Sequence, residues 1–149
     1  MNPLVYDEGM ASGAYEVLEH PADIGFRAYA STLPELFAAS AFAMLSIADD
    51  PAAAEPRCQY HLSVASGDRE SLLVDWLNEV LYWYDGKRIA FREFRVDAWS
   101  DEAIDAVGFG EPRDPDRHRS RLIVKAVTYH QLKIEQRGEL WVAEVYLDI

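Results

Sequence analysis

Two carboxylates come together at the end of the sequence, on the side chain of Asp148 and on the terminal residue Ile149. Residues 139–149 alternate between the two faces of a strand up to the final residue, which should hold the terminal carboxylate on ordered backbone. Two fixed carboxylates repel each other unless one is protonated or a cation lies between them. Their oxygen atoms suit a hard divalent cation such as Ca²⁺, Mg²⁺ or Mn²⁺. The alternative is a solvated chain end, and the spacing by itself favours that alternative.

A third oxygen ligand is available if the turn of sequence HPAD meets the end of the chain. Its last residue, Asp23, carries the carboxylate, and its first, His20, could bind the cation or orient Asp23 through a hydrogen bond. Aspartate also caps turns very commonly, so the H-x-x-D spacing has little specificity of its own.

Two further residues of interest lie in the alternating run over residues 124–136. Strand alternation places Lys125 on one face and His130 on the other, beside Val124 and Ala126. A histidine on an apolar strand face is more often a core residue than a catalyst. An unpaired buried ammonium is costly, so Lys125 should either lie on a solvated face or neutralise a carboxylate.

The segment of residues 111–121, EPRDPDRHRSR, is expected to be a polar loop. Its arginines could bind phosphate, but Asp114 and Asp116 interrupt them, which favours a solvated loop with internal ion pairs. The sequence has no glycine-rich phosphate loop, no G-x-S-x-G and no H-E-x-x-H motif. The residues therefore indicate a candidate oxygen-ligand metal site and no evident catalytic machinery.

Composition limits the class of protein. The chain has 149 residues, half of them hydrophobic, and a net charge of −12, which fits one compact domain. The single cysteine, Cys58, excludes an internal disulfide and a cysteine-based zinc site, and it favours a reducing compartment, hence the cytoplasm. No apolar run is long enough to span a membrane, and the acidic charge argues against direct binding of nucleic acid.

The elements that must position these residues predict an α+β fold, a single domain with a mostly antiparallel sheet and two amphipathic helices. One helix is expected between the caps Thr32 and Asp49, and the other between Asp68 and Gly86. Strands are expected over residues 15–20, 25–31, 60–65, 89–100, 103–110, 124–136 and 139–149. A bulge is expected between Phe91 and Phe94, and a hairpin turn at Arg137–Gly138. Residues 1–13 are expected to form a disordered tail before the domain of residues 14–149.

Several segments together resemble the archease family. They are HPADIGFRAYASTLPELFAASAFAM, LLVDWLNEVLY, GEPRDPDRH, VKAVTYHQLKI and the closing YLDI, in the family's order and spacing. The resemblance implies an α+β protein that assists the GTP-dependent RNA ligase joining 2′,3′-cyclic-phosphate or 3′-phosphate ends to 5′-hydroxyl ends. Family members promote guanylylation of that ligase and its repeated turnover, and they are activators rather than enzymes.

The resemblance also implies a site. The family's metal site, associated with calcium, corresponds to Asp23, Asp148 and Ile149, with magnesium or manganese as other candidates. His20, Lys125 and His130 lie in shared motifs, where they could support the ligands or contact the ligase. RNA is expected to be reached only through the ligase, in tRNA splicing or RNA repair. Two alternatives stay open: a stand-alone metal-dependent hydrolase that uses Asp23 and Asp148, and a chaperone-like binding module.

Overall fold

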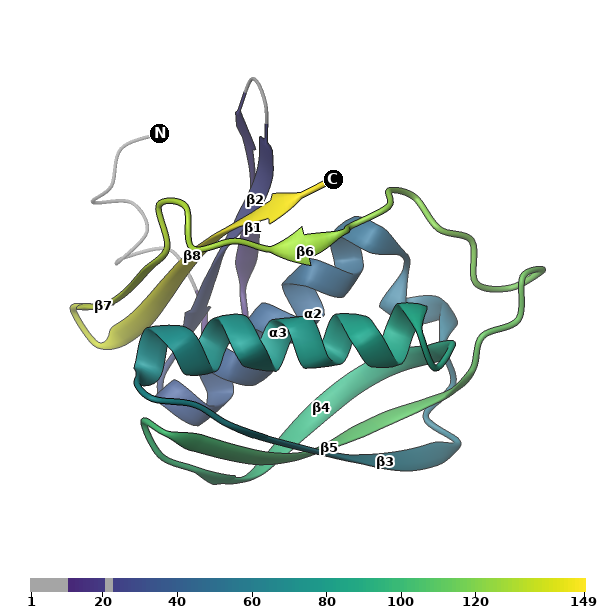
Figure 1. Cartoon of the computed structure of the whole chain (residues 1–149), viewed down its shortest axis with the longest axis horizontal. Helices are drawn as coiled ribbons and strands as arrows, with labels where there is room; N and C mark the ends of the chain where they lie inside the picture. Colours follow the sequence, from purple (N-terminus) through teal and green to yellow (C-terminus); the bar gives the residue numbers. More distant parts are fainter. Residues whose placement is uncertain (1–10, 21–22) are drawn as a thin grey trace.

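Two helices lie between two antiparallel sheets (Figure 1). The computed structural model describes residues 11–20 and 23–149, and of Glu19 and His20 only the backbone. The first sheet has the order β1 (Tyr15–His20), β2 (Asp23–Ala30), β8 (Leu140–Asp148) and β6 (Ala126–Val127), and β7 (Lys133–Arg137) also pairs with β8. The second has the order β3 (Cys58–Ala65), β5 (Ala103–Pro112) and β4 (Ile89–Trp99). The helices are α2 (Leu33–Ala48) and α3 (Arg69–Asp85), with a short 3₁₀ helix, η1 (Pro51–Ala53), after α2.

Both helices begin at the predicted caps. The Glu35 N–H donates to the Thr32 hydroxyl at 3.3 Å, and the Ser71 N–H donates to the Asp68 carboxylate at 2.8 Å. Each cap satisfies a main-chain donor that has no partner inside its helix. The predicted ends at Asp49 and Gly86 are confirmed as well.

Helix α2 is buried on almost its whole surface because strands of both sheets pack against it. Its small residues let β2 and β4 approach closely, and the Phe37 ring packs edge-on against Trp99 of β4 with 5.6 Å between centroids. The Trp76 indole N–H of α3 donates to the main-chain oxygen of Phe37 at 2.9 Å, and both side chains are fully buried. Removing side chains of this size from water is the main favourable contribution to folding.

The expected α+β fold is confirmed, with two sheets where the sequence suggested one. The expected bulge in β4 is also confirmed, since the register shifts between Phe91 and Glu93, and a second shift follows between Val96 and Ala98. Within the described residues, no helix is long and apolar enough to cross a membrane.

The single long strand expected over residues 124–136 is wrong. Only β6 and β7 are strands, and the chain between them turns at His130 and Gln131, where Gln131 has a φ of 53°. Val127 of β6 is opposite Leu147 of β8, and Lys133 of β7 is opposite Glu144 of β8. The segment from β6 to β7 therefore spans six residue steps where the facing part of β8 spans three. The three extra residues break the alternation on which the predicted faces of Lys125 and His130 depended.

The predicted hairpin at Arg137–Gly138 is present between β7 and β8, with Arg137 opposite Leu140. Gly138 has a φ of 61°, a conformation that favours glycine. Of the tail expected over residues 1–13, residues 1–10 lie outside the described chain. Ser12 and Gly13 make hydrogen bonds to the domain, since the Gly13 N–H donates to the main-chain oxygen of Tyr29 at 2.6 Å and the Ser12 hydroxyl donates to Glu35 at 2.8 Å.

Candidate functional site

Asp23 and Asp148 lie side by side at one end of the first sheet. Strands β2 and β8 are antiparallel with Ile24 opposite Leu147, so the next position on each strand is Asp23 and Asp148. Strand β1 brings the backbone of His20 opposite Asp23, and β6 brings Ala126 opposite Asp148. Figure 1 shows the C-terminus at the same end of the molecule as the β1–β2 hairpin.

Both aspartates point to the outer face of this sheet. Phe26, Val145 and Leu147 are fully buried on the face that covers the helices, and strand alternation turns Asp23 and Asp148 the other way. Asp23 is half-buried and Asp148 is exposed, as is Ile149. No basic side chain among residues 11–18 and 23–149 forms an ion pair with either aspartate. Among the side chains that the structure describes, these two acids therefore lie together at the end of the sheet with no basic partner.

The donors at this corner fit a hard cation in type but give only part of a coordination shell. Among the described residues, no three His, Cys, Asp or Glu side chains gather closely enough to hold a metal ion. The two aspartates supply oxygen donors, and Ile149 follows Asp148 directly. The side chain of His20 and the residues Pro21 and Ala22 of the HPAD turn lie outside the described residues. Calcium and magnesium accept water and other oxygen ligands beside one or two carboxylates.

Lys125 is attached to this corner through its backbone. Its main-chain N–H donates to the main-chain oxygen of Asp148 at 2.7 Å, while its side chain is exposed. The ammonium group makes no ion pair with a described carboxylate, so the solvated-face interpretation fits better than neutralisation of an acid. The residue lines an open depression of about 690 Å³ that Ile149 also borders.

His130 is not a core residue, contrary to the predicted strand face. It is exposed in the turn after β6, where its main-chain N–H donates to the Thr128 hydroxyl at 3.3 Å. Its ring meets the Tyr146 ring edge-on, with 6.2 Å between centroids. Tyr146 in turn lies across Gly25, where an added Cβ would come within 2.5 Å of the Val145 main-chain oxygen and 2.9 Å of the Tyr146 ring. Glycine at this position lets β2 and β8 approach beside the aspartates.

A ladder of charges fixes the strands behind the corner. On the outer face, Arg27 of β2 pairs with Glu16 of β1 at 3.2 Å and with Glu144 of β8, and Lys133 of β7 lies 3.7 Å from Glu144. The side chain of Arg27 is only 12% exposed, so these pairs are screened less than surface pairs. Four strands are thus joined in register on the face that carries Asp23 and Asp148.

A second polar cluster, centred on a buried carboxylate of the second sheet, was not predicted from the sequence. Glu111, in β5, is fully buried and accepts hydrogen bonds from Arg117, Arg57, the Glu55 N–H and His118. The hydrogen bond from Arg117, with those from Glu55 and Arg57, holds the pKa of the Glu111 carboxyl far below its usual range although burial opposes this. The expected internal ion pairs of residues 111–121 are present and most of the segment is exposed, while its two buried residues, Glu111 and His118, anchor it in the interior.

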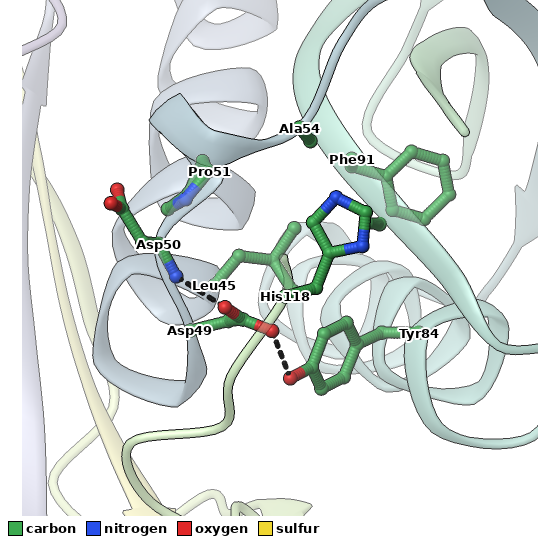
Figure 2. A pocket seen from close by; sticks show the side chains of 9 residues that line it. Leu45, Asp49, Asp50, Pro51, Ala54, Tyr84, Phe91 and His118 are labelled. Atoms are coloured by element: carbon green, nitrogen blue, oxygen red, sulfur yellow. Dashed lines mark hydrogen bonds between the residues drawn. The ribbon is translucent and has the colours of Figure 1, made fainter. Parts of the chain in front are cut away.

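His118 joins this cluster to a small cavity (Figure 2). The Asp114 N–H donates to His118 Nδ1 at 2.7 Å, so Nε2 carries the ring proton and donates to Glu111 at 3.1 Å. Across the cavity, buried Asp49 accepts hydrogen bonds from the Tyr84 hydroxyl and the Asp50 N–H, both at 2.7 Å. Burial, together with Asp49, raises the pKa of Tyr84 to about 12. The cavity is about 10 Å³, room for a single water, so this cluster stabilises the fold and does not bind a substrate.

The resemblance of the sequence motifs is confirmed by comparison with known proteins. The model of the archease protein family (MTH1598/TM1083) matches residues 15–149. Protein archease of Methanosarcina acetivorans is 42% identical over 139 residues, which cover 91% of this chain and 95% of that protein. Protein archease of Sulfurisphaera tokodaii is 36% identical over 138 residues, which cover 91% of this chain and 98% of that protein.

Solved structures agree with these matches. The solution structure of protein 1598 of Methanobacterium thermoautotrophicum has a TM-score of 0.76 and 32% identity, covering 92% of this chain and 99% of that chain. The crystal structure of an archease, possible chaperone, from Thermotoga maritima has a TM-score of 0.63 at 18% identity, covers 90% of this chain and 96% of that chain, and supports the fold alone. With its α+β fold and a family match across nearly the whole sequence, the chain belongs to the archease family.

Proposed function

We propose that this protein is an accessory factor for a GTP-dependent RNA ligase, which it assists in guanylylation and repeated turnover. Family membership supports a role of this kind. The observation that carries the proposal is the adjacent pair Asp23 and Asp148, held on paired strands and left without a cation among the described residues. A bound divalent cation, or a basic site on a partner, would stabilise such a pair by relieving the repulsion between its two carboxylates.

In the proposed complex, Asp23, Asp148 and the carboxylate of Ile149 hold a divalent cation, calcium by preference. When bound, the cation would neutralise negative charge near the nucleotide phosphates of the ligase. The strands β2 and β8 keep the carboxylates in one place, and the charge ladder of Arg27 keeps those strands in register. Exposure of Asp148 and Ile149 lets this corner enter the site of a partner without unfolding. His20, Lys125 and His130 would surround the corner as contacts to the ligase.

The shape of this region supports an activator more than a stand-alone hydrolase. Asp148 is exposed, and the neighbouring depression bordered by Lys125 and Ile149 is open rather than enclosed. An acid–base pair in a hydrolase needs a site that excludes water and shifts the pKa of one carboxyl. A hydrolase would turn over a small molecule without the ligase, and a general chaperone would protect unrelated proteins from aggregation with or without Asp148.

The test is a ligation assay with the cognate ligase, GTP, and an RNA substrate in large excess over the ligase. We expect ligation to stop near one round per ligase molecule without this protein and to continue through many rounds with it. Equal yields with and without the protein, at every divalent cation concentration, would contradict the proposal. Hydrolysis of a small molecule by the purified protein would favour the enzyme alternative.

A further inference from the structure

Two arginines of this acid-rich chain, Arg88 and Arg119, have side chains without a hydrogen-bond or ion-pair partner in the part of the chain that the structure describes. The chain has 26 acidic and only 14 basic residues, so partners are plentiful. The other arginines all donate to a carboxylate or to a main-chain oxygen, as Arg92 does to Ala52 and Ala54. Both side chains are exposed, so their guanidinium groups are available to a ligand.

Both arginines line the same pocket. It is an open pocket of about 400 Å³, and its lining consists of Arg88, Arg113, Pro115, His118, Arg119 and Ser120. The lining contains three guanidinium groups and a hydroxyl but no carboxylate. Its volume falls in the range of small-molecule sites, roughly 300–1,000 Å³.

Arg113 is held in place at this pocket before any ligand arrives. Its side chain is only 9% exposed, and its guanidinium lies over the Tyr84 ring at 4.2 Å from the centroid. It donates to the Ser120 hydroxyl at 3.1 Å and to the main-chain oxygen of Tyr84 at 3.4 Å. Asp85 is its nearest acid, at 3.9 Å. A cation fixed in this way loses little conformational freedom on binding.

Arg113 also keeps an unused donor. Its Nε is buried and has no hydrogen-bond partner among the described residues. Buried donors in folded proteins almost always have partners, so this orphaned one is a polar group that a bound water or ion would satisfy. By contrast, both ring nitrogens of His118 are already bonded, so His118 offers no free ring nitrogen to a ligand in the pocket.

The backbone ties Arg88 to this cation. The Arg113 N–H donates to the main-chain oxygen of Arg88 at 2.8 Å, just beyond the pairing of Ile89 with Pro112. Arg88 has a φ of 62°, a conformation that glycine adopts readily and a long side chain rarely does. The turn between α3 and β4 thus holds a charged residue in an unfavourable backbone conformation at the rim of a basic pocket.

We infer that this pocket binds a phosphate group, such as that of a nucleotide polyphosphate or of a phosphorylated RNA end. The planar guanidinium fork matches the oxygen atoms of phosphate, and three arginines with a hydroxyl supply donors on several sides. Ion pairs occupy Arg117, with Glu111 and Asp114, and Arg121, with Asp50, whereas Arg88 and Arg119 have none among the described residues. This inference stands apart from the acidic corner and concerns the protein without its ligase.

The test is calorimetric titration of the purified protein with sodium pyrophosphate at constant ionic strength. The variants Arg119→Ala and Arg88→Gly each remove one guanidinium, and glycine tolerates the backbone conformation at position 88. We expect saturable binding to the unmodified protein, and affinity about tenfold lower in each variant, as for loss of one charge-assisted hydrogen bond. The matched control is Arg95→Ala, which removes an exposed arginine seven residues along from Arg88, paired with Asp97, and should leave the affinity unchanged.

Absence of saturable binding, or an equal loss in Arg95→Ala, would overturn the inference. A second arm compares GTP with guanosine, and a short RNA ending in a 3′-phosphate with the same RNA ending in a hydroxyl. The phosphorylated member that binds more tightly than its counterpart, and loses this preference in Arg119→Ala, identifies the source of the phosphate. If neither phosphorylated member is preferred, the pocket binds neither a nucleotide polyphosphate nor a phosphorylated RNA end, and the inference is overturned.

Discussion

Replacing Asp148 with alanine is expected to reduce ligation to the level of the ligase alone while leaving the fold intact. The variant removes one of the two adjacent carboxylates, and a single aspartate beside the end of the chain binds a divalent cation far more weakly. The side chain is exposed and makes no ion pair with a described residue, so the unfolding free energy should change by no more than about 0.5 kcal/mol. Multiple-turnover ligation and thermal unfolding measure the two effects separately.

Two further variants separate charge from size and place. Asp148→Asn keeps the shape of the side chain and should fail equally, because the amide lacks the negative charge. Asp105→Ala removes an exposed aspartate from β5 of the other sheet, and it should stimulate the ligase as the unmodified protein does. Full stimulation by Asp148→Ala, or loss of stimulation in Asp105→Ala as well, would show that the corner is not the site.

The second large effect is expected on stability, from Glu111→Gln. The carboxylate of Glu111 is fully buried and accepts hydrogen bonds from Arg117, Arg57, Glu55 and His118. An amide offers one oxygen, so some of these donors lose their partner, and the charge that attracts both arginines is gone. Arg57 and Arg117 are partly exposed and can turn to water, so we expect a loss of about 3 kcal/mol, or roughly 10 °C in Tm.

The same variant should remove part of the pH dependence of stability. The folded chain holds the pKa of Glu111 far below its ordinary value of 4.5, chiefly through Arg117. A depressed pKa contributes stability that is fully present above the unfolded value and is lost as the pH falls toward the folded value. The difference in unfolding free energy between the unmodified protein and Glu111→Gln should therefore be largest near pH 7 and shrink below about pH 4.5.

Denaturant unfolding at several pH values measures this difference directly. Glu93→Gln is the matched control, because Glu93 is exposed on β4 and makes no ion pair with a described residue. Its unfolding free energy should match that of the unmodified protein within about 0.5 kcal/mol at each pH. A deficit in Glu111→Gln that stayed constant from about pH 7 to pH 3 would contradict the assigned role of the carboxylate.

Local rules predicted the regular parts of the fold well. Thr32 and Asp68 cap helices because their side chains serve donors only three residues away. The bulge near Phe91 could be predicted because a side chain out of phase with the alternation needs an extra residue. The break after β6 could not, because it depends on how residues 128–132 meet Tyr146 across the sheet.

The candidate sites also contain parts that neighbouring residues predict and parts that depend on distant segments of the chain. Asp148 could be placed on a strand face because the alternating pattern of β8 reaches it, whereas its position beside Asp23 depends on the register of β2 and β8, which the sequence left open. Glu111 and Arg57 are 54 residues apart, and nothing local in either segment indicates that they meet. The basic pocket could not be predicted for a related reason: Arg88 reaches it from the turn after α3, and Asp114 and Asp116 indicated that the arginines beside them were neutralised.

The central claim is tested most directly by the fraction of ligase that becomes guanylylated after mixing with GTP. The ligase is recovered after one round of ligation and incubated with GTP and increasing calcium, magnesium or manganese, with this protein, with Asp23→Asn or with no addition. The account predicts that the unmodified protein restores guanylylation in a cation-dependent way and that Asp23→Asn does not. Guanylylation that is equally complete without the protein, or with Asp23→Asn, would contradict it.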